Sequence, residues 1–215
     1  MRYANLRNWL KLWGVNNKLK LSGSGERVKN LFLWLQEFYS GSHRFYHTLE
    51  HIDHCLQELM LWDRFCKTAL LDHLALALWF HDVIYDPRAK DNEEQSADFA
   101  GRTMRELNPG MPDEFIKIVQ ELILATKHIK LPRGFEQSLI ADIDLSSLGS
   151  RRDVFDANRR AIRTEYAYLS DANFENRNQE FLKTLLARPL IFSVPYFQNK
   201  YEVQARRNIV SVLDR

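Results

Sequence analysis

Apolar residues recur along this chain at the three- and four-residue spacing of an α-helix. Near its start, apolar side chains at 6, 9, 10 and 13 fall on one face of a helix. The same spacing predicts further helices over about 28–35, 48–62, 68–85, 91–108, 113–128, 134–141, 151–169, 173–187 and 197–213. No stretch alternates apolar and polar residues over the length of a strand. The pattern therefore predicts an all-α protein.

The length of the chain, 215 residues, suits one buried core. No internal repeat and no low-complexity linker divides it. We therefore expect a single all-helical domain over residues 1–215.

Charge and hydropathy exclude several classes of partner. The 30 Lys and Arg residues nearly balance the 28 Asp and Glu residues, so no long-range field favours extended nucleic acid or an anionic membrane. The longest strongly apolar run, 74–80, is far shorter than the roughly 20 residues that span a bilayer. The N-terminus lacks the pattern of a signal peptide, and two cysteines fit a reduced, cytoplasmic setting.

Three histidines, His47, His51 and His54, lie close together after a Gly-Ser break. In a helix they would share one face at the edge of the buried stripe. Two histidines four residues apart can bind one ion or one substrate. A solvated polar face that happens to carry histidines is the alternative interpretation.

A His81-Asp82 pair stands in a run, from Ala75 to Tyr85, that is apolar on every side of a helix. Such a helix is expected to be buried. An uncompensated buried carboxylate is costly or becomes protonated, so the pair needs partners. A divalent metal would be one partner; a helix cap or an ion pair with a buried arginine are the alternatives.

Two further carboxylates, Asp142 and Asp144, alternate with apolar residues near the end of a short predicted helix. Taken alone, acids in such a place are typical of a turn or of a cap for the next helix.

The order of these segments, His then His-Asp then Asp, resembles the HD superfamily of metal-dependent phosphohydrolases. The resemblance covers about residues 43–149, with Phe80-His81-Asp82 at its centre. In that superfamily a histidine, a His-Asp pair on the next helix and a distant aspartate converge on a metal. The resemblance implies a helical bundle of HD type, with its core at about 25–150 and the helices of 151–215 packed on it.

The arrangement from Tyr46 to His51 is also similar to that of cyclic-nucleotide phosphodiesterases, distant members of the superfamily. In those enzymes the second histidine binds metal and the first donates a proton to the leaving oxygen. Carried over by position, His47 becomes the general acid, and Asp82 also orients the attacking water. The implied metal ligands are His51, His81, Asp82 and Asp144.

The last aspartate of the pattern can be matched by Asp142 or by Asp144. We favour Asp144, because many relatives have two aspartates here and the second precedes a leucine.

Imidazole and carboxylate ligands suit Mn²⁺, Fe²⁺, Co²⁺, Ni²⁺, Mg²⁺ or Zn²⁺, and such an ion would activate water for attack on a phosphoester. Candidates to bind the substrate phosphate are Arg44, Lys127 and His128.

The resemblance thus implies hydrolysis of a small phosphorylated substrate, such as a nucleotide. The alternative is a catalytically idle HD module that binds a nucleotide or phosphorylated ligand and acts as a regulator. The sequence selects neither the substrate nor the oligomeric state.

Overall fold

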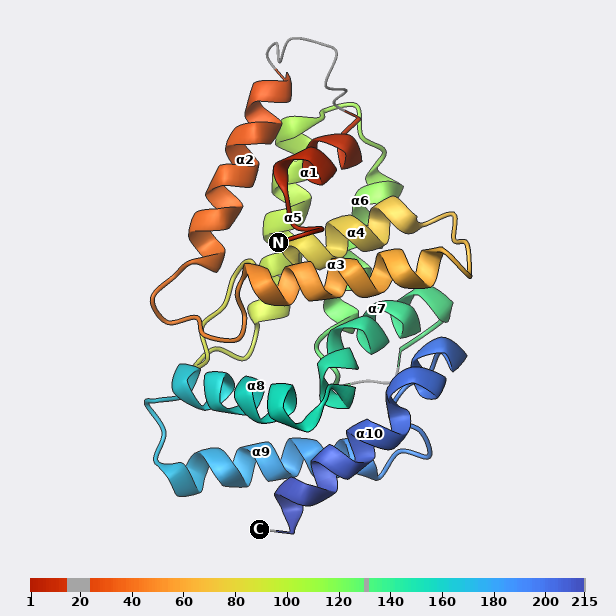
Figure 1. Cartoon of the computed structure of the whole chain (residues 1–215). Coiled ribbons are helices and arrows are strands. Elements are labelled where there is room, and N and C mark those ends of the chain that lie inside the picture. Colours follow the sequence, from red (N-terminus) through yellow and green to blue (C-terminus); the bar gives the residue numbers. More distant parts are fainter. Residues whose placement is uncertain (15–23, 130–131, 215) are drawn as a thin grey trace. The chain divides into compact units, whose positions relative to one another are not determined.

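The computed structural model describes residues 1–14, 24–129 and 132–214. These residues form ten α-helices, one short 3-10 helix (η1) and no strand, which confirms the predicted all-α class. In chain order they are α1 (Leu6–Leu12), α2 (Ser24–Tyr39), α3 (Leu49–Asp63), α4 (Leu71–Phe80), α5 (Asn92–Leu107), α6 (Asp113–Ala125), α7 (Phe135–Leu145), η1 (Ser146–Gly149), α8 (Arg152–Glu165), α9 (Asp171–Leu186) and α10 (Pro195–Leu213) (Figure 1). Within these described ranges, no helix is long and apolar enough to cross a membrane.

The chain divides into two compact units, Met1–Leu131 and Pro132–Arg215. The first contains α1 to α6, and the second contains α7 to α10 together with η1. The division therefore lies ahead of α7, whereas the sequence suggested a core that ends near residue 150. The assignment of the whole chain to one domain stays a prediction.

Helix α4 is the centre of the first unit. Every residue from Leu74 to Phe80 is buried, as expected for a helix that is apolar on all sides. The ring of Trp79 lies 5.1 Å from that of Trp9 on α1 and 5.8 Å from that of Phe32 on α2. The indole N–H of Trp9 donates to the Val28 carbonyl at 2.8 Å, so this buried polar group is satisfied. These contacts hold α4 against α1 and α2.

Helix α4 ends at Phe80 and not, as predicted, near Tyr85. In a continued helix the N–H of Ile84 would bond to the Phe80 carbonyl. It donates instead to Ser96 Oγ on α5, at 3.1 Å, and Ser96 Oγ lies 3.3 Å from the Ile84 carbonyl oxygen. The hydrogen bonds between Ile84 and Ser96 thus accompany the end of α4, and they lie ahead of Pro87 in the sequence. The His-Asp pair consequently lies in the turn after α4 and not inside the helix.

Helix α3 begins at Leu49, after the N-cap residue Thr48, whose Oγ1 accepts a hydrogen bond from the Glu50 N–H at 3.3 Å. His47 therefore precedes the helix. His47 and His51 consequently do not share a helical face, because Thr48 has an extended conformation.

In the second unit, α10 packs closely on η1. A Cβ atom added at Gly149 would lie 2.5 Å from Cβ of Tyr201, so only glycine allows this approach. The Asn208 side chain donates to the carbonyls of Leu148 and Ser150 at 2.8 and 2.9 Å. These contacts anchor the segment that directly follows α7.

Candidate metal centre

Three side chains of the first unit bring ligand atoms together: His51 from α3, and His81 and Asp82 from the turn after α4. The Nε2 atoms of the two histidines are 3.2 Å apart. Asp82 Oδ2 lies 3.0 Å from His81 Nε2 and 3.6 Å from His51 Nε2. Both histidines are buried, while the Asp82 side chain is 16% exposed. The group is therefore compact, and Asp82 is its most exposed member.

The spacing of these atoms fits a divalent cation. Two ligand atoms at about 2.1 Å from an ion lie about 3.0 Å apart in adjacent octahedral positions and about 3.4 Å apart in a tetrahedron. The three observed separations, 3.0, 3.2 and 3.6 Å, are close to these values. Two imidazoles and a carboxylate are also a donor set that first-row divalent metals bind. This group of residues can therefore hold a metal ion.

A backbone group orients the ring of His81. Its Nδ1 lies 2.9 Å from the carbonyl oxygen of Leu78. A carbonyl oxygen only accepts, so Nδ1 donates a proton to Leu78, and Nε2 is the nitrogen that faces His51 and Asp82. Metal-binding histidines commonly donate their second N–H in this way. Nε2 of His81 is thus the nitrogen that a metal would bind, in place of the proton that it shares with Asp82.

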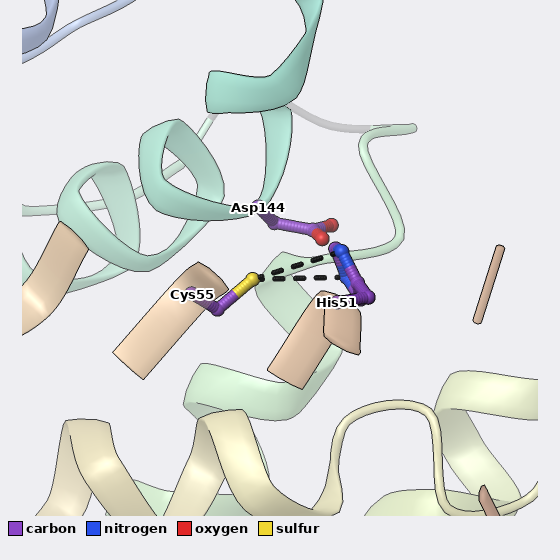
Figure 2. A group of neighbouring side chains, drawn as sticks. All are labelled: His51, Cys55 and Asp144. Carbon is purple, nitrogen blue, oxygen red and sulfur yellow. Dashed lines mark hydrogen bonds between the residues drawn. The ribbon is translucent and has the colours of Figure 1, made fainter. Parts of the chain in front are cut away.

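Cys55 lies one turn beyond His51 on α3. Its Sγ is 3.7 Å from Nε2 and 3.9 Å from Nδ1 of the His51 ring (Figure 2). The nearly equal distances place the buried sulfur against the ring and not along the lone pair of Nε2. We infer that Cys55 packs the ring of His51 in place. Cys55 was not among the candidate residues singled out from the sequence, although its four-residue spacing from His51 would have predicted this contact.

The charge of Asp82 is controlled by its neighbours. Burial by itself would raise the pKa of Asp82, because a carboxylate loses its hydration. The charges of the nearby His81, His47 and His51 rings, and a hydrogen bond with His81, outweigh burial and hold the pKa of this carboxyl well below its ordinary value. The carboxylate therefore stays ionised, as a metal ligand must.

His47 lies beside this group but is not one of its three donors. Its ring centroid is 6.0 Å from that of His51 and 4.2 Å from that of Tyr85, with the His47 and Tyr85 planes inclined by 30°. Its charge contributes to lowering the pKa of Asp82. The imidazole is therefore near the carboxylate and packed on an aromatic ring.

The guanidinium of Arg44 binds the backbone. Nη1 donates to the carbonyls of His47 at 2.9 Å and Asp82 at 2.8 Å, and Nη2 donates to the Val83 carbonyl at 2.9 Å. The residue is only 7% exposed. These contacts give Arg44 a structural role, and they do not support its predicted contact with substrate phosphate.

The other two predicted phosphate contacts follow α6. Lys127 Nζ lies 2.5 and 2.6 Å from the carboxylate oxygens of Glu94 and 2.7 Å from the Lys90 carbonyl. Hydrogen bonding with Lys127 lowers the pKa of Glu94, whereas burial raises the pKa of Glu93. The charge of Lys127 is thus balanced by α5. His128 is half-buried in the same turn, with a φ of 57°, and phosphate binding by either residue stays a prediction.

Asp142 and Asp144 belong to α7 in the second unit. Both carboxylate oxygens of Asp142 accept the Ser193 N–H, at 3.0 and 2.9 Å, and Oδ2 also accepts the Val194 N–H at 2.6 Å. The Ser193 and Val194 N–H groups lie just ahead of α10. Donors at the start of a helix lack partners within it, and the carboxylate supplies one. Asp142 therefore binds the start of α10, whereas the sequence suggested a turn or a cap for the next helix. Asp144 is half-buried, and its role as a metal ligand stays a prediction.

Two further contributors to the site, the Leu78 carbonyl and Ser96 Oγ, were not foreseen. A backbone carbonyl leaves no mark in a sequence, and a serine hydrogen bond to a distant turn depends on tertiary packing.

No family model, curated protein or solved structure matches the chain. The candidate site therefore rests on the residues and their geometry.

Proposed function

We propose that the chain is a metal-dependent phosphohydrolase whose ion is held by His51, His81 and Asp82, with Asp144 as a further ligand. One observation carries the proposal: two imidazole nitrogens and a carboxylate oxygen lie 3.0–3.6 Å apart. The reaction class comes from the resemblance of the His, His-Asp and Asp pattern to HD-superfamily enzymes.

The residues around the ion have separate tasks in this proposal. A bound divalent ion supplies Lewis acidity and an activated water. Asp82 stays ionised and offsets the charge of the ion. His47, outside the donor set, holds a proton for the leaving oxygen, a task suited to a side chain with an ordinary pKa of about 6.5. The close contact of the His47 ring with the tilted ring of Tyr85 supports this role by restricting the imidazole.

The proposed substrate is a small phosphoester, such as a nucleotide. The nearly neutral chain offers no broad positive surface charge, so recognition must be local. A small substrate needs only such a local site.

The test is an assay of phosphomonoesters, nucleotides and cyclic nucleotides with added Mn²⁺, Co²⁺ or Mg²⁺. Asp82→Asn is compared with Asp98→Asn, a matched change at an exposed carboxylate on α5. We expect Asp82→Asn to lose turnover at least about 100-fold, since losing groups that merely orient ligands already costs about 10- to 100-fold. Asp98→Asn should keep wild-type activity.

Two results would oppose the proposal. Turnover that survives in Asp82→Asn excludes this carboxylate from the reaction. Stoichiometric metal without turnover of any substrate instead favours a regulatory module that binds a phosphorylated ligand.

A further inference from the structure

Arg44 connects the two segments that carry the candidate site. Its guanidinium donates to the carbonyl of His47, ahead of α3, and to the carbonyls of Asp82 and Val83, after α4. All three donor–acceptor distances lie between 2.8 and 2.9 Å. A charged donor makes such bonds stronger than neutral ones. One side chain thus holds together two pieces of backbone that are far apart in the sequence.

The electrostatics of a helix end explain why a cation is buried here. Carbonyl groups at a helix C-terminus lack N–H partners and carry partial negative charge. Asp82 and Val83 follow α4 directly, so their carbonyls extend that negative end. The rigid fork of a guanidinium can reach carbonyls of two segments at once, whereas a lysine ammonium is a single point of charge.

Aromatic rings complete the environment of Arg44. Its guanidinium carbon lies 5.0 Å from the centroid of Tyr39 and 5.3 Å from that of Tyr85, within the range of cation–π attraction. Tyr39 also donates its hydroxyl to the carbonyl of Trp79 in α4, at 2.8 Å. Tyr85 contacts the His47 ring on which the proposed proton transfer depends. Arg44 therefore acts on His47 twice, through its carbonyl and through the neighbouring ring.

We propose that Arg44 is a positioning residue, which fixes the His47 imidazole relative to the Asp82 carboxylate by holding both backbones. The kinetic part of this proposal rests on the proposed function, while the positioning concerns the chain alone. It replaces the sequence-based prediction that Arg44 binds substrate.

The first test is NMR of histidine-ring signals in the metal-free, chelator-treated chain. Arg44→Lys is compared with Arg102→Lys, an exposed control on α5, and the His47 signals are assigned with His47→Gln. Arg44→Lys should move the His47 signals, which the ring current of Tyr85 shifts in the wild type, toward those of an exposed histidine. Arg102→Lys should leave them in place.

His73 serves as an internal reporter of folding. Its ring lies 3.8 Å from that of Phe115, away from the contacts of Arg44. An unchanged His73 signal beside a displaced His47 signal supports positioning. Unchanged His47 signals, or a loss of both, would overturn the proposal, because Arg44 would then either not hold His47 or support the whole fold.

The second test uses any substrate that the wild type turns over. Misplacement of a reacting group by about 1 Å can cost about 100-fold in rate, so Arg44→Lys should lower kcat by about 10- to 100-fold. KM should stay within about twofold, whereas a lost phosphate contact would chiefly raise KM. A raised KM with unchanged kcat would contradict positioning. If the wild type turns over nothing, the proposed function fails, and the NMR result still decides the role of Arg44.

Discussion

A single hydrogen bond decides which nitrogen of His81 faces the other candidate ligands. Because the Leu78 carbonyl holds the Nδ1 proton, Nε2 is the nitrogen that would bind an ion. The His51 ring is similarly restricted by the buried Cys55 thiol. A cation would therefore meet donors that are already placed, which reduces the entropy lost on binding.

The proposed role of His47 predicts a dependence on the leaving group. His47→Gln should lower kcat about 100- to 10,000-fold for alkyl phosphoesters, whose leaving oxygen needs a proton. With p-nitrophenyl phosphate, whose leaving group departs as an anion, the loss should be much smaller. Steady-state rates on both substrates check this, and equal losses on the two would contradict general-acid catalysis by His47.

The lowered pKa of Asp82 predicts a pH dependence of stability. Because the folded-state pKa lies below the unfolded value of about 3.9, ionised Asp82 stabilises the fold above about pH 4, and the contribution disappears as pH falls through the folded-state pKa. Denaturant unfolding of metal-free wild type and Asp82→Asn should thus show a larger stability difference at pH 5 than at pH 2. A stability difference that grows on acidification would show that the folded-state pKa of Asp82 is not lowered.

At the scale of helices, periodicity predicts where helices exist better than where they end. The buried stretch of α4 follows from its apolar residues alone. Its end depends on Ser96 and Arg44, which bond to the following turn from elsewhere in the chain. Such tertiary contacts leave no periodic signal, so the sequence placed His81 and Asp82 inside a helix when they lie just beyond it.

The start of α10 provides a test that separates Asp142 from Asp144. Asp142→Asn weakens the buried cap on Ser193 and Val194, so we expect it to lower the free energy of unfolding by about 1–3 kcal/mol with metal affinity nearly unchanged. Asp144→Asn should instead weaken metal binding and leave the free energy of unfolding nearly unchanged. Denaturant unfolding and metal titration of both variants check this; loss of metal binding in Asp142→Asn alone would reverse the assignment.

For the molecule as a whole, the sequence predicted the all-α class and three candidate ligands that do converge, His51, His81 and Asp82. Each carries a chemical signature that spacing can reveal. The division before α7 was not predicted, because the sequence between α6 and α7 is not a Gly-, Ser- or Pro-rich linker. The roles of Arg44 and Asp142 were also missed, since both bind backbone groups whose position only the fold determines.

The metal content of the chain after equilibrium dialysis against Mn²⁺ or Co²⁺ tests directly whether His51, His81 and Asp82 bind an ion. We expect about one tightly bound ion per wild-type chain, because the three ligands are already close together. His51→Gln, His81→Gln and Asp82→Asn should each weaken binding at least about 100-fold. His73→Gln, a change at a half-buried histidine on α4, should have no effect. A wild-type chain without stoichiometric metal, or undiminished binding in Asp82→Asn, would show that these residues do not form a metal site.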